Sequence, residues 1–191
     1  MITTSESEVI KKFLGNKYLA LVPISLRLEE TIAGGPTDAS ATLQLSDGEK
    51  LQVSATGNGL LDALFAACCS QFSGKFKSLK TLELDSFKVV SRLETRKRQR
   101  GSDAKVEIEM GIKNAYGEIV FFNATNRSLV AAITMVVVEA IEFFINTELA
   151  YFTALDALND AQKRGRHDLT EKYTALLANF VKYTNYSLEE V

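Results

Sequence analysis

Residues 47–64 read DGEKLQVSATGNGLLDAL, and residues 116–133 read YGEIVFFNATNRSLVAAI. The two stretches align without a gap at a spacing of 69 residues, the distance from Gly48 to Gly117. Gly, Glu, Ala, Thr and Leu coincide, and apolar residues of the first stretch fall on apolar residues of the second. A repeat of this kind predicts a domain built from two copies of one supersecondary unit that pack together.

Hydrophobic alternation predicts the strands of the first unit. Apolar residues alternate over 18–28, which predicts a strand, and the Gly- and Pro-containing segment 33–38 predicts a loop. Two further alternating runs flank the turn at 46–48, so we expect a hairpin there. The residues Gly57-Asn58-Gly59 separate this hairpin from a helix expected over 60–72. The first unit is therefore expected to be βββα.

The same order returns in the second half of the chain. A strand region, a loop, two more strands and a helix start are expected at about 82–93, 96–103, 106–112, 119–124 and 126–128. Either Ser128 or Asn126 is suited to cap this helix. Neither Gly nor Pro occurs between Gly117 and Gly165, so the helix is expected to run to about residue 163.

A last helix is expected over 168–186, capped by Asp168. The sequence thus predicts an α+β fold of two pseudo-symmetric βββα units plus a C-terminal helical hairpin. We expect a core over 1–146, with units at about 18–73 and 80–146, and a helical extension over 147–191.

Composition narrows the class of protein. The chain has 191 residues, of which 46% are hydrophobic and 24% charged, as in an ordinary soluble globular domain. Its net charge of -2 argues against a dedicated nucleic-acid binder. His167 is the only histidine, and neighbours such as Cys68 and Cys69 do not easily bridge each other. We therefore expect no thiolate metal site, no intramolecular disulfide and no cofactor.

We expect a cytoplasmic protein. The first residues lack the basic head and apolar core of a secretory signal. The longest apolar stretch, 129–145, is interrupted by Glu139 and Glu142 and is short for a membrane span, so it predicts a core helix. Within it, Val136-Val137-Val138 is apolar on more than one face, which favours burial on both sides and a homodimer.

The Gly57-Asn58-Gly59 segment is the strongest local signal of a site. Glycines let the backbone turn sharply and approach a neighbour closely. Free amides at the start of the following helix attract a carboxylate or phosphate. The alternative is a tight turn with a packing role only, because the segment lacks the third glycine of a dinucleotide fingerprint and the lysine of a phosphate loop.

The same segment carries a resemblance to a family. Residues 54–65 resemble the Gly-Asn-Gly-Pro-Val-Asp-Ala-Leu segment of the C-terminal allosteric domain of α-isopropylmalate and citramalate synthases. Residues 84–89 are similar to that family's Leu-x-x-Tyr-x-Val strand, and residues 101–104 to its Gly-x-Asp-Ala. The helix after Ser128 fits the family's final Ala-rich helix, so the resemblance spans about 18–146.

The resemblance implies a dimerising regulatory module of branched-chain amino acid biosynthesis that binds an amino acid or 2-keto acid between its units. It further implies action on a separate catalytic subunit, because the catalytic barrel of the synthases is missing. Their metal-binding His-x-His cannot exist in a chain with one histidine, which excludes the synthase reaction. The residues that match the first half of the family's effector site are Gly57, Asn58, Gly59, Asp62 and Ala63.

The second half of the effector site departs from the family pattern. Where the family has Gly-x-Gly-x-x-Thr-Asp, this chain has Asn126, Arg127 and Ser128, without the glycines or the acid. An effector ammonium would lose a partner here, which favours a 2-keto acid over an amino acid. The competing hypothesis is a structural dimerisation or assembly protein that has lost the effector site. An enzyme is disfavoured because no nucleophile–base pair or pair of carboxylates stands out.

Other conspicuous residues have structural interpretations. The basic run 92–100 lacks interleaved aromatic residues, so we expect a solvated hairpin tip and no nucleic-acid contact. Arg164, Arg166 and His167 suit an exposed helix connection. The helically spaced tyrosines Tyr173, Tyr183 and Tyr186 are expected to pack.

Overall fold

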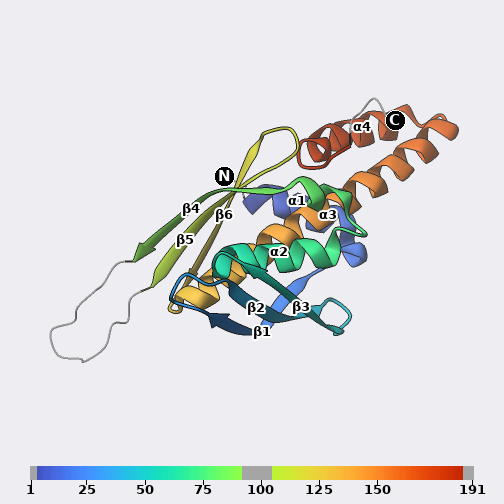
Figure 1. The fold of residues 1–191 in the computed structure, drawn as a ribbon. Helices are drawn as coiled ribbons and strands as arrows, with labels where there is room; N and C mark the ends of the chain where they lie inside the picture. Colours follow the sequence, from blue (N-terminus) through green and yellow to red (C-terminus); the bar gives the residue numbers. More distant parts are fainter. Residues whose placement is uncertain (1–3, 92–104, 187–191) are drawn as a thin grey trace, which may run out of the picture.

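The computed structural model describes residues 4–91 and 105–186, and the structural statements below refer to these residues (Figure 1). Two three-stranded antiparallel sheets are each followed by a helix, and the second of these helices pairs with a last one, which confirms the predicted α+β fold. The elements in chain order are α1 (Thr4–Leu14), the 3-10 helix η1 (Gly15–Lys17), β1 (Leu21–Glu30), β2 (Thr37–Leu45), β3 (Lys50–Gly57), α2 (Leu60–Phe72), the 3-10 helix η2 (Lys77–Thr81), β4 (Glu83–Ser91), β5 (Val106–Lys113), β6 (Ile119–Asn126), α3 (Leu129–Lys163) and α4 (His167–Val181).

The second hairpin repeats the register of the first. Thr37 lies opposite Gly57 in the β2–β3 pair, and Val106 lies opposite Asn126 in the β5–β6 pair, with both partners shifted by 69 residues. Every later pair keeps the same shift. The sequence repeat is therefore a structural repeat, residue for residue, over both hairpins.

The irregularities repeat as well. The pairing of β1 with β2 shifts register just after Pro23, and the pairing of β4 with β5 shifts just after Leu84. Pairing resumes at Thr42 in the first unit and at Gly111 in the second, again 69 residues apart. Each first strand thus carries a β-bulge at the same place in its unit, where the extra residue bends the strand away from its partner.

The shared Gly of the sequence repeat serves the hairpin turns. Gly48 has a φ of 87° and Gly117 a φ of 79°, in the left-handed region that favours glycine. Each of these glycines donates its N–H to the carbonyl three residues earlier at 3.0 Å.

The helices α2 and α3 form the centre of the molecule. Helix α2 packs on β2, β3 and α3, while α3 contacts β5 and β6 on one side and α1, α2 and β1 on others. Figure 1 shows the sheet β1–β3 below these helices and the sheet β4–β6 above them. The main core lies where both helices meet the inner faces of the sheets, around Leu43, Leu64, Met110 and Ile141, all fully buried.

Helix α3 is the core helix that the sequence predicts. Val136, Val137 and Val138 are all buried within this single chain, so their apolar character needs no partner molecule. By length and composition alone α3 could also cross a membrane, but 67% of its most apolar window is buried in the fold. It also runs without a break across the boundary expected between the core over 1–146 and the helical extension over 147–191.

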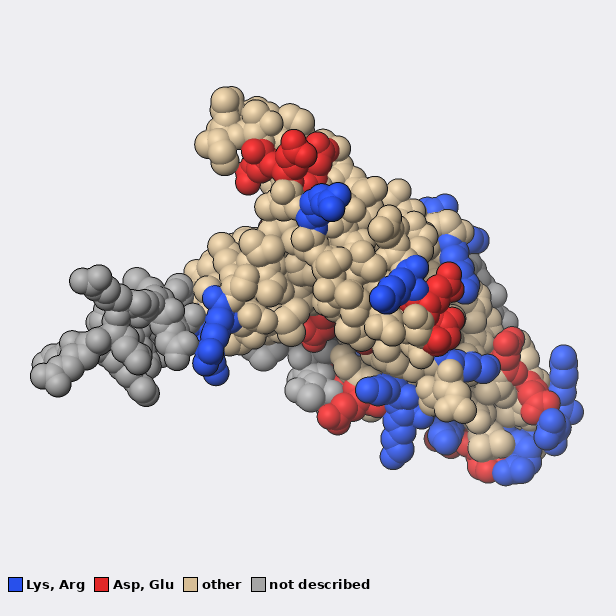
Figure 2. All heavy atoms as spheres, turned by 90° about the horizontal axis from the view of Figure 1, so that it is seen from below, with Lys and Arg blue, Asp and Glu red and all other residues tan. Residues whose placement is uncertain are grey.

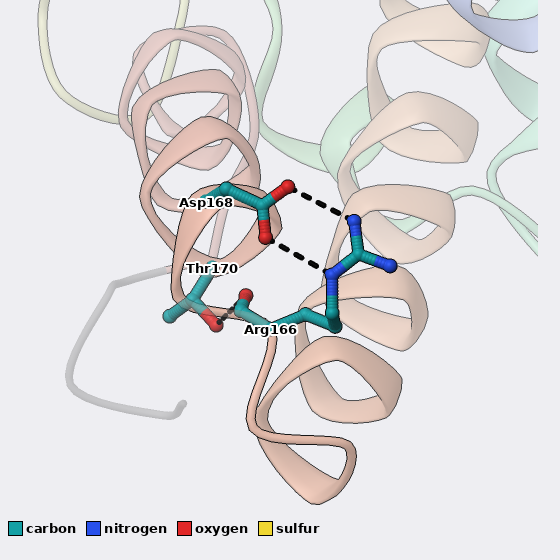
Figure 3. A network of polar contacts seen from close by, with 3 residues as sticks. All are labelled: Arg166, Asp168 and Thr170. Carbon is teal, nitrogen blue, oxygen red and sulfur yellow. Dashed lines mark hydrogen bonds and ion pairs between the residues drawn. The ribbon is translucent and has the colours of Figure 1, made fainter.

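Helix α4 begins one residue earlier than expected, and Asp168 is not its cap. Arg166 is the N-cap residue, and its guanidinium donates to both carboxylate oxygens of Asp168 at 3.1 and 3.0 Å (Figure 3). The Thr170 hydroxyl donates to the Arg166 carbonyl at 3.0 Å. The hydrogen bonds from Arg166 lower the pKa of Asp168. Asp168 instead occupies the first turn, where a negative charge favours the helix dipole.

The predicted end of α4 at residue 186 is also wrong, because the chain after Val181 turns back onto the core. Asn185 donates to the carbonyl of Lys77 at 3.1 Å and accepts from the Thr81 hydroxyl at 2.8 Å. The Tyr186 ring stacks on Tyr151 with centroids 5.1 Å apart. These tertiary contacts replace the helical hydrogen bonds that the local pattern predicts. Tyr173, Tyr183 and Tyr186 are all partly buried against the core, as expected.

Two other boundaries differ from expectation. Strand β2 takes in Thr37 from the predicted loop. Strand β1 begins at Leu21 rather than Tyr18, because the backbone of Leu19 bonds to the Asn146 side chain instead of to a strand. The basic run, the predicted loop at 96–103 and the Gly-x-Asp-Ala match at 101–104 lie outside the described residues.

Candidate functional site

The first predicted half-site, at the start of α2, is occupied by a side chain of the protein itself, that of Asp62. The Asp62 carboxylate accepts a hydrogen bond from the backbone N–H of Asn58 at 2.9 Å. This contact resembles a capping box, in which a side chain in the first turn satisfies an amide just before the helix. The helix start therefore already holds an anion where an effector carboxylate was expected.

Gly57, and not Gly59, is the position that requires glycine. A Cβ at Gly57 would lie 2.5 Å from the Ala63 nitrogen and 2.7 Å from the Asp62 carboxylate, whereas a Cβ at Gly59 would meet nothing within 4 Å. Gly59 has a φ of 169°, which is extended backbone open to any residue. A side chain at Gly59 would therefore not clash with the described protein. The glycine segment forms a close strand-to-helix turn, which favours the packing interpretation.

The second predicted half-site, at the start of α3, is also capped from within. The Ser128 hydroxyl oxygen accepts from the Ala131 N–H at 3.3 Å, which confirms Ser128 as the helix cap. The Asn126 side chain accepts from the Ser128 N–H at 3.1 Å. Arg127 is exposed beside them. Ser128 keeps its hydroxyl hydrogen as a donor, because the described bond uses only its oxygen.

The eight predicted residues do not line one common cleft. Ala63 is fully buried in the core and faces no solvent. Ser128 lines a cleft of about 450 Å³ between β1 and α3, and none of the residues from Gly57 to Ala63 lines that cleft. The only overlap of the predicted site with this cleft is therefore Ser128.

We call this cleft the β1–α3 surface. It is formed by residues 22–26 of β1 and by Ser128, Val130, Ala131, Thr134 and Met135 of α3. None of these residues is charged, and Val22, Ile24, Val130 and Met135 are exposed. The sequence held a signal for this surface, because Val22, Pro23 and Ile24 are consecutive apolar residues and cannot share one face of a regular strand.

A second cleft of about 510 Å³ lies between α1, β6 and α3, and we call it the α1–α3 cleft. Its polar side chains come from Ser7, Glu8 and Lys11 of α1, from Tyr18, from Asn123 of β6, and from Glu139, Glu142 and Asn146 of α3. In the sequence, Glu139 and Glu142 are visible only as interruptions of an apolar stretch. Nothing in the local pattern signals that α1 lies opposite them.

The two cysteines have no reactive thiolate. Cys68 and Cys69 are both free, and burial raises the pKa of each thiol to about 12. At neutral pH both therefore remain protonated and act as small apolar residues of α2. Within residues 4–91 and 105–186, no group of three or more His, Cys, Asp or Glu residues could hold a metal ion.

Comparison of the sequence with protein-family models gives no match, and comparison with curated proteins gives none either.

Proposed function

We propose that the protein is a non-catalytic assembly module that forms a homodimer through the β1–α3 surface. The observation that carries this proposal is the group of exposed apolar side chains that β1 and the start of α3 place together. Val22 is 51% exposed, and Ile24, Val130 and Met135 are exposed to a similar degree. Contiguous exposed apolar surface of this kind is typical of interaction sites.

The absence of charge on the β1–α3 surface favours a second copy as the occupant. In a twofold interface the same patch meets itself, so a charged residue near the axis would face its own like charge. All residues that line this surface are uncharged. Figure 2, which views the molecule from the side of the sheet β1–β3, likewise shows a broad central area without Lys, Arg, Asp or Glu.

Light scattering of matched variants tests the proposal. We expect a dimer mass for the full chain at tens of micromolar and a monomer mass for Val22→Glu and Met135→Glu, because each places a charge in the apolar contact. Val9→Glu is the control. Val9 of α1 is 48% exposed, nearly as much as Val22, but it lies outside the β1–α3 surface. A monomer mass for the full chain, or a dimer that survives both variants, would contradict the proposal.

A regulatory module that binds a small carboxylate effector is the second candidate. It is favoured by Ser128, whose hydroxyl can donate to a carboxylate and which borders the 450 Å³ cleft between the two units. Under this hypothesis a 2-keto acid or amino acid at 100 times its Kd adds about 2.7 kcal/mol to the free energy of unfolding. A thermal-shift screen with both classes of compound checks this. If neither class raises the melting temperature, assembly is the one proposed function that remains.

A further inference from the structure

The α1–α3 cleft combines an aromatic floor with a polar rim. Phe121 and Phe143 line it, and the Phe143 ring packs edge-on against Phe122 with centroids 5.7 Å apart. Its volume of about 510 Å³ lies within the range of small-molecule sites, which usually present apolar walls and a few polar groups. It shares no lining residue with the β1–α3 surface.

Part of the rim is fixed by hydrogen bonds of the fold. The Glu142 carboxylate accepts from the Tyr18 hydroxyl and from the Leu21 N–H, both at 2.6 Å. The Asn146 amide bonds to both the N–H and the carbonyl of Leu19 at 2.8 Å. These contacts hold the segment before β1 against α3, so this wall of the cleft is preorganised.

Of the two carboxylates that α3 contributes to the cleft, Glu142 is bonded within the fold and Glu139 is not. It lies three residues before Glu142 and therefore on the same face of α3. Among the described residues it forms no hydrogen bond or ion pair. Partial burial and the charge of Glu142 raise the pKa of Glu139, so its surroundings disfavour the negative charge. A cation beside Glu139 would relieve this cost.

The charges that face the cleft also favour a cation. Glu8, Glu139 and Glu142 contribute three carboxylates, against one ammonium from Lys11. The Lys11 nitrogen lies 5.6 Å from the centroid of the Tyr18 ring, so it rests on the aromatic face rather than on a carboxylate.

We propose that the α1–α3 cleft binds a small organic cation, a primary ammonium on an apolar or aromatic body. The ammonium bonds to Glu139, and the body lies on Phe121 and Phe143. This site is independent of the proposed dimer.

Calorimetry with three probes of one shape tests the site in the full chain. Phenethylamine carries the cation, 2-phenylethanol is its neutral counterpart and phenylacetate the anion. We expect phenethylamine to bind about tenfold more tightly than the alcohol, because its bond to Glu139 is charge-assisted. Phenylacetate should not bind, because the cleft is negative overall.

Variants then locate the binding. Glu139→Gln keeps the shape and should lower phenethylamine affinity about tenfold, to that of the alcohol. Ser7→Trp should block all binding by filling the cleft. Glu171→Gln changes an exposed carboxylate of α4 outside the cleft and should change nothing. Equal affinities for the three probes, an unchanged affinity in Glu139→Gln, or no binding of phenethylamine at millimolar concentration would overturn the proposal.

Discussion

At the scale of residues, Gly57 and Gly59 form a matched pair for a stability test. We expect Gly57→Ala to lower the free energy of unfolding by about 1–3 kcal/mol, because its Cβ would overlap the backbone at Ala63. Gly59→Ala should be neutral or slightly stabilising, since its backbone is extended and its Cβ meets open space. Urea unfolding of both variants checks this. Equal losses in the two would show that the turn is not closed as described.

Glu139 gives a prediction with a definite sign in pH. Its pKa is raised in the folded state above the usual 4.5, so the folded chain holds this proton more tightly than the unfolded chain. The free energy of unfolding therefore loses a contribution as pH rises from about 4.5 through the raised pKa. Glu139→Gln removes the charge, so it should be more stable than the natural chain at pH 7 and show no gain at low pH. Thermal melts from pH 4 to 8 measure the difference between the two curves. Parallel curves would mean that Glu139 is fully solvated.

At the scale of elements, local patterns predict what local forces decide. The hairpins and the bounds of α2 and α3 follow from alternation, turn glycines and a Ser cap, all of which act within a few residues. The helix and strand boundaries that the sequence does not predict are determined by long-range contacts. The start of β1 depends on Asn146, which is 127 residues from Leu19, and the end of α4 depends on η2.

The same holds for the candidate site: the sequence predicts its local features but not its long-range contacts. Its helix starts are visible in the sequence because glycines and caps mark them, but the sequence cannot show that Asp62 folds back onto Asn58. The two clefts arise where β1 or α1 meets α3, more than 100 residues later in the chain. Their lining residues are ordinary apolar and acidic residues at the level of sequence, so only the packing of elements reveals them.

Glu148 of α3 binds both η2 and the segment that follows α4. Its buried carboxylate accepts the backbone N–H groups of Lys77 and Ser78 at 3.1 and 2.8 Å and the Tyr186 hydroxyl at 3.0 Å. Glu148→Ala leaves these donors without an acceptor, so we expect a loss of about 2–3 kcal/mol in the free energy of unfolding. Glu171→Ala, on the exposed face of α4, is the control and should stay within about 0.5 kcal/mol. Guanidinium unfolding measures both, and equal values would show that the contact at η2 is not formed.

At the scale of the whole molecule, the two βββα units share register, bulges and turns but not their helices. Helix α2 has 13 residues and ends at Phe72, whereas α3 has 35 and continues beyond its own sheet. The added length carries α4 and the returning segment 182–186, which bonds to η2 and to the turn at Asn114. The C-terminal helices therefore act as a clamp that joins η2, which lies between the two units, to the turn at Asn114 in the second unit.

Truncation after Asn146 tests this clamp. It removes the buried side chains of Tyr151, Leu158, Leu177 and Phe180, each of which contributes about 1.5–3 kcal/mol through burial. The summed loss, about 6 kcal/mol or more, is comparable with the total stability of an ordinary domain. We therefore expect the melting temperature to fall by about 10 °C or more, with newly exposed apolar surface that lowers solubility. A chain that ends at Tyr186 is the control and should melt like the full chain, because the contacts described for the clamp all lie within it. If the chain that ends at Asn146 also melts like the full chain, the C-terminal helices do not stabilise the core.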